Sequence, residues 1–266
     1  MTVGATEVSV ERWRDGRSER LTDRVAEEVP VAITYQGVPH VVMLASPRDL
    51  EDLGVGFTLS EAIVADRAEI RDVQAEARTD GSFEVRVGID AEPFSALLRR
   101  QRNLTGRTGC GLCGAETVEE AIRHPAAVTD GVRVTSAELH QVLVDLQRYQ
   151  PMNAQTGSVH AAAWVVPDAG IRCAREDVGR HNALDKTIGA IVRGGHDLTQ
   201  GYFVITSRAS YEMVQKAATV GVSLVAAVSA PTAFAVRMAY ETGITLIGFA
   251  RERQHVVYTH AHRLTS

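Results

Sequence analysis

The hydrophobic pattern of the first half of the chain predicts β-strands and one helix. Apolar runs over 31–35 and 40–44 flank residues 36–39, which predicts a β-hairpin with a four-residue connection. From Pro47 to about Val64, apolar residues recur at helical spacing. Strict alternation of apolar and polar residues over 82–89 predicts a half-buried strand.

The last third of the chain alternates apolar strands with helices. Thr135–Glu138 fits a capping box, which predicts an earlier helix that ends near Tyr149. Uniformly apolar strands separated by helices indicate a parallel sheet covered on both faces, so the predicted fold class is α/β. The predicted strands are 202–206, 222–228, 244–249 and 256–258, and the predicted helices are 182–192, 211–220 and one that follows 229–232 and ends at Glu241.

These patterns predict three regions. A polar, loosely ordered tail covers 1–20, an N-terminal β-containing subdomain covers 21–130, and a C-terminal α/β subdomain covers 131–266. Within the second region, residues from about 99 to 114 are rich in Arg, Gly and Thr and show no periodicity. We expect this stretch to form a long mobile loop, a kind of segment that is usually functional.

Composition and charge exclude several classes of protein. The 266 residues are 45% hydrophobic and 23% charged, which is an ordinary globular balance. A formal net charge of -5 gives no support to broad nucleic-acid binding. No apolar run approaches the roughly 20 residues of a membrane span, and the N-terminus lacks the apolar segment of a secretory signal. Three cysteines are too few for a disulfide scaffold, so we expect reduced thiols in the cytoplasm.

Two of the three cysteines lie in one glycine-rich motif, TGCGLCG, at residues 108–114. Glycine lets the backbone bend sharply and lets another molecule approach the sulfur atoms of Cys110 and Cys113. Three uses are compatible with such a pair: half of a zinc site, a dithiol–disulfide switch, or a thiol that carries sulfur.

The surrounding sequence weighs against two of these uses. A closed zinc site needs four ligands, and Cys173, His160 and His181 could complete this one only from far along the chain. A thioredoxin-like pair lies at a strand-to-helix junction, whereas this pair follows an arginine-rich stretch without periodicity. Sulfur transfer needs an exposed thiolate, which Arg107 would favour, and a separate anion-binding cavity for the acceptor.

Hydroxyl and arginine side chains gather where the predicted parallel strands end. Residues 207–210, 229–232 and 249–254 all lie at the carboxyl edge of the sheet, where open α/β sheets bind ligands. Helix N-termini favour anions at such an edge, and arginine suits phosphate. Helix capping is an equally good explanation of the serine and threonine residues. The binding candidates at this edge are Ser207, Arg208, Ser229, Thr232, Phe249, Ala250, Arg251, Glu252, Arg253 and Gln254.

The segment 175–186 is dense in functional groups at the start of a predicted helix. His181 is a candidate for cofactor binding or general acid–base chemistry, with a hydrogen-bonded structural histidine as the alternative. Lys186, one of only two lysines, is a candidate for proton movement. Asn182 fits a helix cap, and Cys173 fits a packed thiol.

Several motifs together resemble the formate dehydrogenase accessory sulfurtransferase family (FdhD). They run in the family's order over roughly residues 20–260, and ordered blocks are far more specific than one Cys-x-x-Cys pair. The matching segments are 108–114, 156–162, 176–186, 207–213, 229–232 and 246–251.

This resemblance implies a cytoplasmic sulfurtransferase that forms a homodimer and takes persulfide sulfur from a cysteine desulfurase. It implies transfer of that sulfur to the molybdenum bis(molybdopterin guanine dinucleotide) cofactor, before the cofactor enters formate dehydrogenase. By position, Cys110 is the persulfide cysteine, Cys113 is its partner, and 249–254 contacts the cofactor. The implied fold is a cytidine deaminase-like three-layer core with a mixed, partly parallel sheet and no tightly held metal. A thiol–disulfide oxidoreductase and a non-catalytic cofactor chaperone are the alternatives.

Overall fold

A four-stranded sheet forms the N-terminal half of the structure, a computed structural model that describes residues 4–103, 125–128 and 130–265. The sheet has the order β4-β3-β6-β5, in which β3 and β6 are parallel. The predicted hairpin, helix and strand are confirmed, but Gln36 and Gly37 alone form the hairpin turn, both at positive φ. The elements of this half are β3 (Val29–Tyr35), β4 (Val38–Ala45), α1 (Leu50–Ser60), η1 (Arg67–Glu69), β5 (Ile70–Ala77), β6 (Phe83–Ile89) and α2 (Ala91–Asn103).

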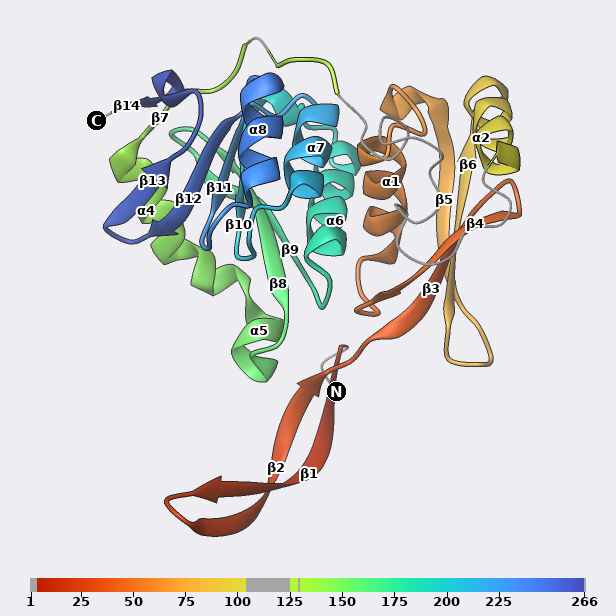
Figure 1. Cartoon of the computed structure of the whole chain (residues 1–266). Helices are drawn as coiled ribbons and strands as arrows, with labels where there is room; N and C mark the ends of the chain where they lie inside the picture. Colours follow the sequence, from red (N-terminus) through yellow and green to blue (C-terminus); the bar gives the residue numbers. More distant parts are fainter. Residues whose placement is uncertain (1–3, 104–124, 129, 266) are drawn as a thin grey trace.

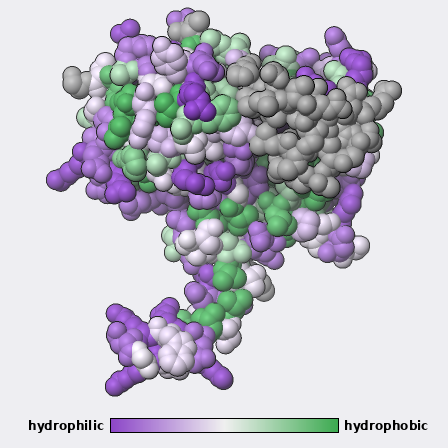
Figure 2. Space-filling view, in the orientation of Figure 1, coloured by the Kyte–Doolittle hydropathy of each residue, from purple (hydrophilic) through white to green (hydrophobic). Residues whose placement is uncertain are grey.

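Residues 5–26 form an arm instead of the predicted loosely ordered tail over 1–20. Strands β1 (Ala5–Arg14) and β2 (Arg17–Ala26) pair antiparallel along their whole length and project from the two halves of the molecule (Figure 1). No residue of either strand is buried, so no alternation of a buried face marks these strands in the sequence. Figure 2 shows hydrophobic as well as hydrophilic surface along the arm.

The first residues of the predicted loop from about 99 to 114 are helical instead. Helix α2 continues to Asn103, so residues 99–103 are helical. Residues 104–124, with Cys110 and Cys113 among them, lie outside the described residues. The nature of the Cys-x-x-Cys segment therefore stays a prediction from the sequence.

A six-stranded sheet of order β13-β12-β11-β10-β8-β9 forms the C-terminal half. Strands β10, β11 and β12 are parallel, whereas the pairings of β8 with β9 and β10, and of β12 with β13, are antiparallel. The sheet is therefore mixed and partly parallel, as predicted, while a cytidine deaminase-like assignment stays a prediction. The strands are β8 (His160–Val166), β9 (Gly170–Asp177), β10 (Tyr202–Ile205), β11 (Leu224–Ala227), β12 (Thr245–Arg251) and β13 (Gln254–Val257).

Helices cover both faces of this sheet (Figure 1). The predicted capping box is confirmed, because Thr135 and Glu138 each accept a hydrogen bond from the other's backbone N–H at the start of α4. Gly179 caps α6, so the prediction that Asn182 does so is wrong. None of the described helices is long and apolar enough to cross a membrane. On one face lie α4 (Ser136–Asp145) and the 3-10 turn η2 (Leu146–Tyr149); on the other lie α6 (Arg180–Arg193), α7 (Tyr211–Thr219) and α8 (Ala233–Glu241).

Short elements complete this half. Strands β7 (Val134–Thr135) and β14 (Leu264–Thr265) pair in parallel beside α4. The others are α5 (Pro151–Thr156), η3 (Leu198–Gln200) and η4 (Ala261–Arg263).

The two halves meet where α1 packs against α6, and one apolar core continues through the contact. A Cβ atom on Gly56 of α1 would lie 1.7 Å from the carbonyl oxygen of Asp185 in α6. A Cβ atom on Gly189 of α6 would lie 1.9 Å from the carbonyl oxygen of Asp52 in α1. Each helix therefore approaches the other at a position where only glycine fits.

We expect Gly189→Ala to lower the free energy of unfolding by about 3 kcal/mol or more, because the added methyl group meets backbone that cannot move away by itself. Urea unfolding at neutral pH measures the change. Gly81→Ala is the control, because Gly81 has a φ of 84° but a Cβ atom there would meet nothing within 4 Å. Gly81→Ala should lower the free energy of unfolding by about 1 kcal/mol, because only the backbone conformation is unfavourable for alanine there. Equal losses in the two variants would contradict a close helix contact.

Candidate ligand-binding site

Side-chain alternation at the ends of β10 and β11 turns one set of residues toward α4. In β10, Val204 packs in the apolar cluster on the α4 side, whereas Ile205 packs in the cluster that includes α6, α7 and α8. Thr206 and Val228, the residues that follow β10 and β11, continue the alternation on the α4 side. These strand ends form the floor of a cavity.

A β-bulge at Phe249 brings β12 to the same side. The pairing of β12 with β13 shifts register between Gly248 and Arg251, and Phe249 has a φ of 50°. Ile247 and Ala250 are three residues apart, yet both pack on the α4 side. In a regular strand they would face opposite sides, so the extra residue places Ala250 in the cavity floor.

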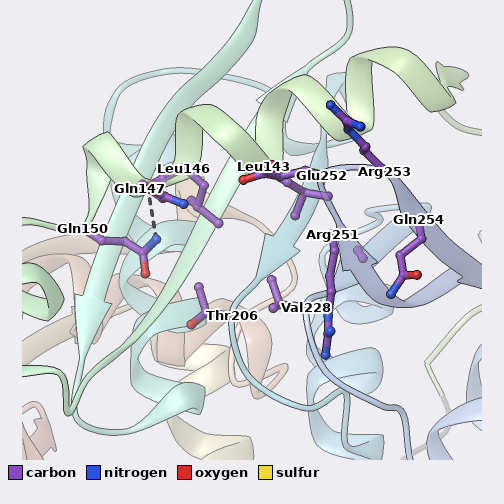
Figure 3. A pocket seen from close by; sticks show the side chains of 11 residues that line it. Leu143, Leu146, Gln147, Gln150, Thr206, Val228, Arg251, Glu252, Arg253 and Gln254 are labelled. Carbon is purple, nitrogen blue, oxygen red and sulfur yellow. Dashed lines mark hydrogen bonds between the residues drawn. The ribbon is translucent and has the colours of Figure 1, made fainter.

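The cavity has a volume of about 680 Å³ and lies between α4 with η2 and the turn that joins β12 to β13 (Figure 3). Such a volume is within the range of small-molecule and cofactor sites, about 300–1,000 Å³. The helical wall is the part that the sequence did not predict, since these residues carry no motif. The lining residues are Leu143, Leu146, Gln147, Gln150, Thr206, Val228, Ala250, Arg251, Glu252, Arg253 and Gln254.

The cavity has a largely apolar floor that includes the hydroxyl of Thr206, and its walls carry cationic and amide groups together with the carboxylate of Glu252. Arg251 and Arg253 are exposed, and neither guanidinium group forms an ion pair or hydrogen bond with any other described residue. Figure 3 shows their side chains extending from opposite sides of the turn. Two free guanidinium groups beside apolar surface suit a ligand that combines phosphate groups with a flat ring system.

Five other predicted binding residues of this sheet edge, Phe249 among them, do not line this cavity. The hydroxyl of Ser207 donates to the backbone oxygen of Arg208, and Arg208 itself is exposed. Thr232 caps α8 by accepting a hydrogen bond of 3.2 Å from the N–H of Ala235. The backbone oxygen of Ser229 accepts a hydrogen bond from the N–H of Phe249. Helix capping and a local hydrogen bond therefore account for the hydroxyls of Thr232 and Ser207.

His181 lies on the opposite face of the same sheet edge, in the first turn of α6. Its Nε2 atom is 3.5 Å from Oε2 of Glu212 in α7, and Ser210 donates a hydrogen bond of 2.6 Å to the same oxygen. His181, aided by Ser210, lowers the pKa of Glu212 to about 2. Burial lowers the pKa of the nearby His160, and the charge of Arg180 lowers it further. His181 thus lies beside a carboxylate and is separate from the cavity.

Both lysines are buried in ion pairs, so neither reaches a ligand. Lys186 is 0% exposed and donates hydrogen bonds of 2.5 Å to Asp177 and 2.9 Å to the backbone oxygen of Ser46. Burial lowers the pKa of Lys186, and Asp177 opposes this effect. Lys216 lies 2.9 Å from both carboxylate oxygens of Asp185. Lys186 therefore lies in a buried ion pair outside the cavity, and its role in proton movement stays a prediction.

Cys173 is packed against the core as predicted. It is partly buried, and this burial raises the pKa of its thiol, which disfavours the reactive thiolate. Within 4–103, 125–128 and 130–265, no group of three or more His, Cys, Asp or Glu side chains could hold a metal ion. Cys110 and Cys113 lie outside those ranges, so this statement does not extend to a metal site that includes them.

Comparison with protein families gives a match over nearly the whole chain. The model of the FdhD/NarQ family matches residues 26–265. A protein of Cupriavidus necator named sulfur carrier protein FdhD is 49% identical over 256 residues, which cover 96% of this chain and 88% of that protein. A protein of the same name from Xanthomonas campestris pv. campestris (strain B100) is 48% identical over 261 residues, 98% of this chain and 92% of that protein.

A solved structure has the same fold. The crystal structure of a protein from Desulfotalea psychrophila, described as a formate dehydrogenase accessory protein, matches with a TM-score of 0.76 and 22% identity. The match covers 98% of this chain and 99% of the other. At this identity the likeness shows the fold alone.

We expect Lys186→Met to lower the free energy of unfolding by about 3–5 kcal/mol, because the Asp177 carboxylate would stay buried without its cation. Urea unfolding at neutral pH measures the loss. The double variant Lys186→Met, Asp177→Asn is the matched control, since it leaves no unpaired charge and should recover part of the stability. A single variant that loses less than about 1 kcal/mol would show that the pair is dispensable.

Proposed function

The chain belongs to the FdhD/NarQ family, and we propose that it acts as a sulfur carrier in the maturation of formate dehydrogenase. The observation that carries this proposal is identity of 48–49% to proteins named sulfur carrier protein FdhD, over 96–98% of this chain. The Cys-x-x-Cys motif supplies the thiols that a sulfur carrier requires. We place this activity in the cytoplasm, where these thiols stay reduced.

In the proposed reaction Cys110 is the residue that carries sulfur. Its thiolate attacks the outer sulfur of a persulfide on a cysteine desulfurase, so that a new S–S bond forms on Cys110 and the donor cysteine leaves as a thiolate. The product is a Cys110 persulfide. Cys113 lies three residues away, close enough in sequence to protect or resolve this persulfide.

The proposed acceptor is the molybdenum bis(molybdopterin guanine dinucleotide) cofactor, which is a substrate here. The cavity supports this choice because the guanidinium groups of Arg251 and Arg253 each suit a phosphate, and the apolar floor at Val228 and Ala250 suits a flat ring. Formate dehydrogenase receives the cofactor afterwards. We also propose that the chain works as a homodimer.

Two other functions make different demands on the cysteines. A thiol–disulfide oxidoreductase would need both Cys110 and Cys113 and would need no nucleotide. A cofactor chaperone would keep its nucleotide affinity and would work without either cysteine. Sulfur loading on Cys110 and the affinity for a guanine nucleotide separate these functions from sulfur transfer.

We expect the wild-type protein to gain one sulfur atom on Cys110 when it is incubated with a cysteine desulfurase and cysteine, as measured by mass spectrometry of its peptides. Cys110→Ala should carry no sulfur and should not restore formate dehydrogenase activity to cells that lack this chain. Cys173→Ala is the control, since the packed thiol should not affect loading. Full enzyme activity with Cys110→Ala would rule out the carrier mechanism.

We expect Arg251→Gln to weaken the binding of guanosine diphosphate about tenfold, because one charged donor to the pyrophosphate is lost. Isothermal titration calorimetry measures the affinity. Arg172→Gln is the matched control, because Arg172 is an exposed arginine on β9, at the other edge of the sheet. If both variants bind like the wild type, the nucleotide lies elsewhere and the cavity has been assigned wrongly.

A further inference from the structure

Two histidines from different elements form a hydrogen bond at one end of the cavity. Nε2 of His140 in α4 lies 3.0 Å from Nδ1 of His255 in β13, and the ring centroids are 5.1 Å apart. Both rings are part-buried. An N–H···N bond between two imidazoles needs one nitrogen to donate and the other to accept, so at least one ring must be neutral.

The pair joins the two walls of the cavity. His140 lies one helical turn before Leu143, which lines the helical wall. His255 directly follows Gln254, which is the first residue of β13 and lines the cavity. The hydrogen bond therefore ties α4 to the strand that carries the arginine-bearing turn.

The other charged groups near the pair have different roles. In α4, Glu138 bonds to Thr135, and Asp145 lies 3.3 Å from Arg148. In the turn before His255, Glu252 and Arg253 line the cavity. Burial lowers the pKa of His255, and the charge of His140 lowers it further.

We propose that the His140–His255 hydrogen bond is a positioning element, which holds the turn carrying Arg251 and Arg253 at a fixed distance from α4 and so sets the affinity of the cavity for its nucleotide ligand. The inference rests on the proposed function, because that function supplies the ligand. Neither histidine is a catalytic residue; each acts through the arginines.

Proton binding gives this positioning role a signature. With no proton or one proton added to the neutral pair, an N–H···N bond persists. With two protons added, Nε2 of His140 and Nδ1 of His255 both carry hydrogen, so neither can accept. The two imidazolium cations then repel, and the two walls of the cavity lose their connection. Because a second charge on a part-buried pair is disfavoured, the loss occurs on the acid side of the ordinary imidazole range, below about pH 6.5.

Calorimetry with di(guanosine-5′) pyrophosphate tests the proposal, because this diester keeps a constant phosphate charge between about pH 5 and pH 8. In the wild type, affinity should be constant from about pH 8 to 6.5 and fall about tenfold toward pH 5. In His140→Gln, the side-chain amide can donate to His255 without titrating at 140, so the affinity at neutral pH should stay and most of the acid loss should disappear. His140→Ala should bind more weakly, by about fivefold, at every pH.

His196→Gln is the control, because His196 is an exposed histidine outside this cavity; it should keep the wild-type acid loss. An acid loss of equal size in the wild type and His140→Gln would overturn the proposal. If the wild type binds no nucleotide at any pH, the proposed function fails, and hydrogen exchange of the free protein decides the role of the pair. Faster exchange of residues 251–257 in His140→Ala than in His140→Gln at the same pH supports positioning, and equal exchange overturns it.

Discussion

The close approach of α1 and α6 is the constraint on which the rest of the structure depends. Gly56 and Gly189 let the backbone of each helix touch the other. At this distance the carboxylates between the helices lie away from water and need cationic partners. Asp185 has Lys216, and Asp52 has two arginines, Arg175 and Arg193. Helix α6 also covers the sheet whose strand ends form the cavity, on the face opposite to that cavity, so the contact between the halves and the ligand site share one sheet.

Elements that bury an apolar face could be predicted from the sequence. The helix around α1, the strand β6 and the alternating elements from β10 to β12 lie close to their expected positions. The arm formed by β1 and β2 could not be predicted in this way, because its strands pair through their backbones and bury no side chain. The ion pairs of the two lysines were also hidden. Asp177 lies only nine residues before Lys186, but nothing in the sequence shows that both side chains turn inward, and the partners of Lys216 come from distant segments.

The candidate site could be located at the right edge of the sheet but not on the right face. The sequence shows where strands end, and residues 250–254 were expected there and line the cavity. It does not show which residues after each strand turn toward α4 and which lead into helices on the other side. Thr206 faces the cavity, whereas the next residue, Ser207, is buried and bonds to the backbone. The helical wall had no signal, because apolar and amide residues on a helix are typical of any packed helix.

The bulge at Phe249 connects these observations. A left-handed conformation costs a non-glycine residue roughly 1–2 kcal/mol, and such conformations persist where the surroundings fix them. Here the N–H of Phe249 bonds to the backbone oxygen of Ser229, which holds the strained residue in place. The bulge decides which face of the sheet Ala250 and the residues after it occupy. The bond of His255 then acts on the same turn from its far end, where it sets the distance to α4. The face of the sheet that the turn occupies and the distance of the turn from α4 are independent requirements. The first depends on Phe249 and Ser229, and the second on His255 and His140, so each is met by residues that lie far apart in the sequence.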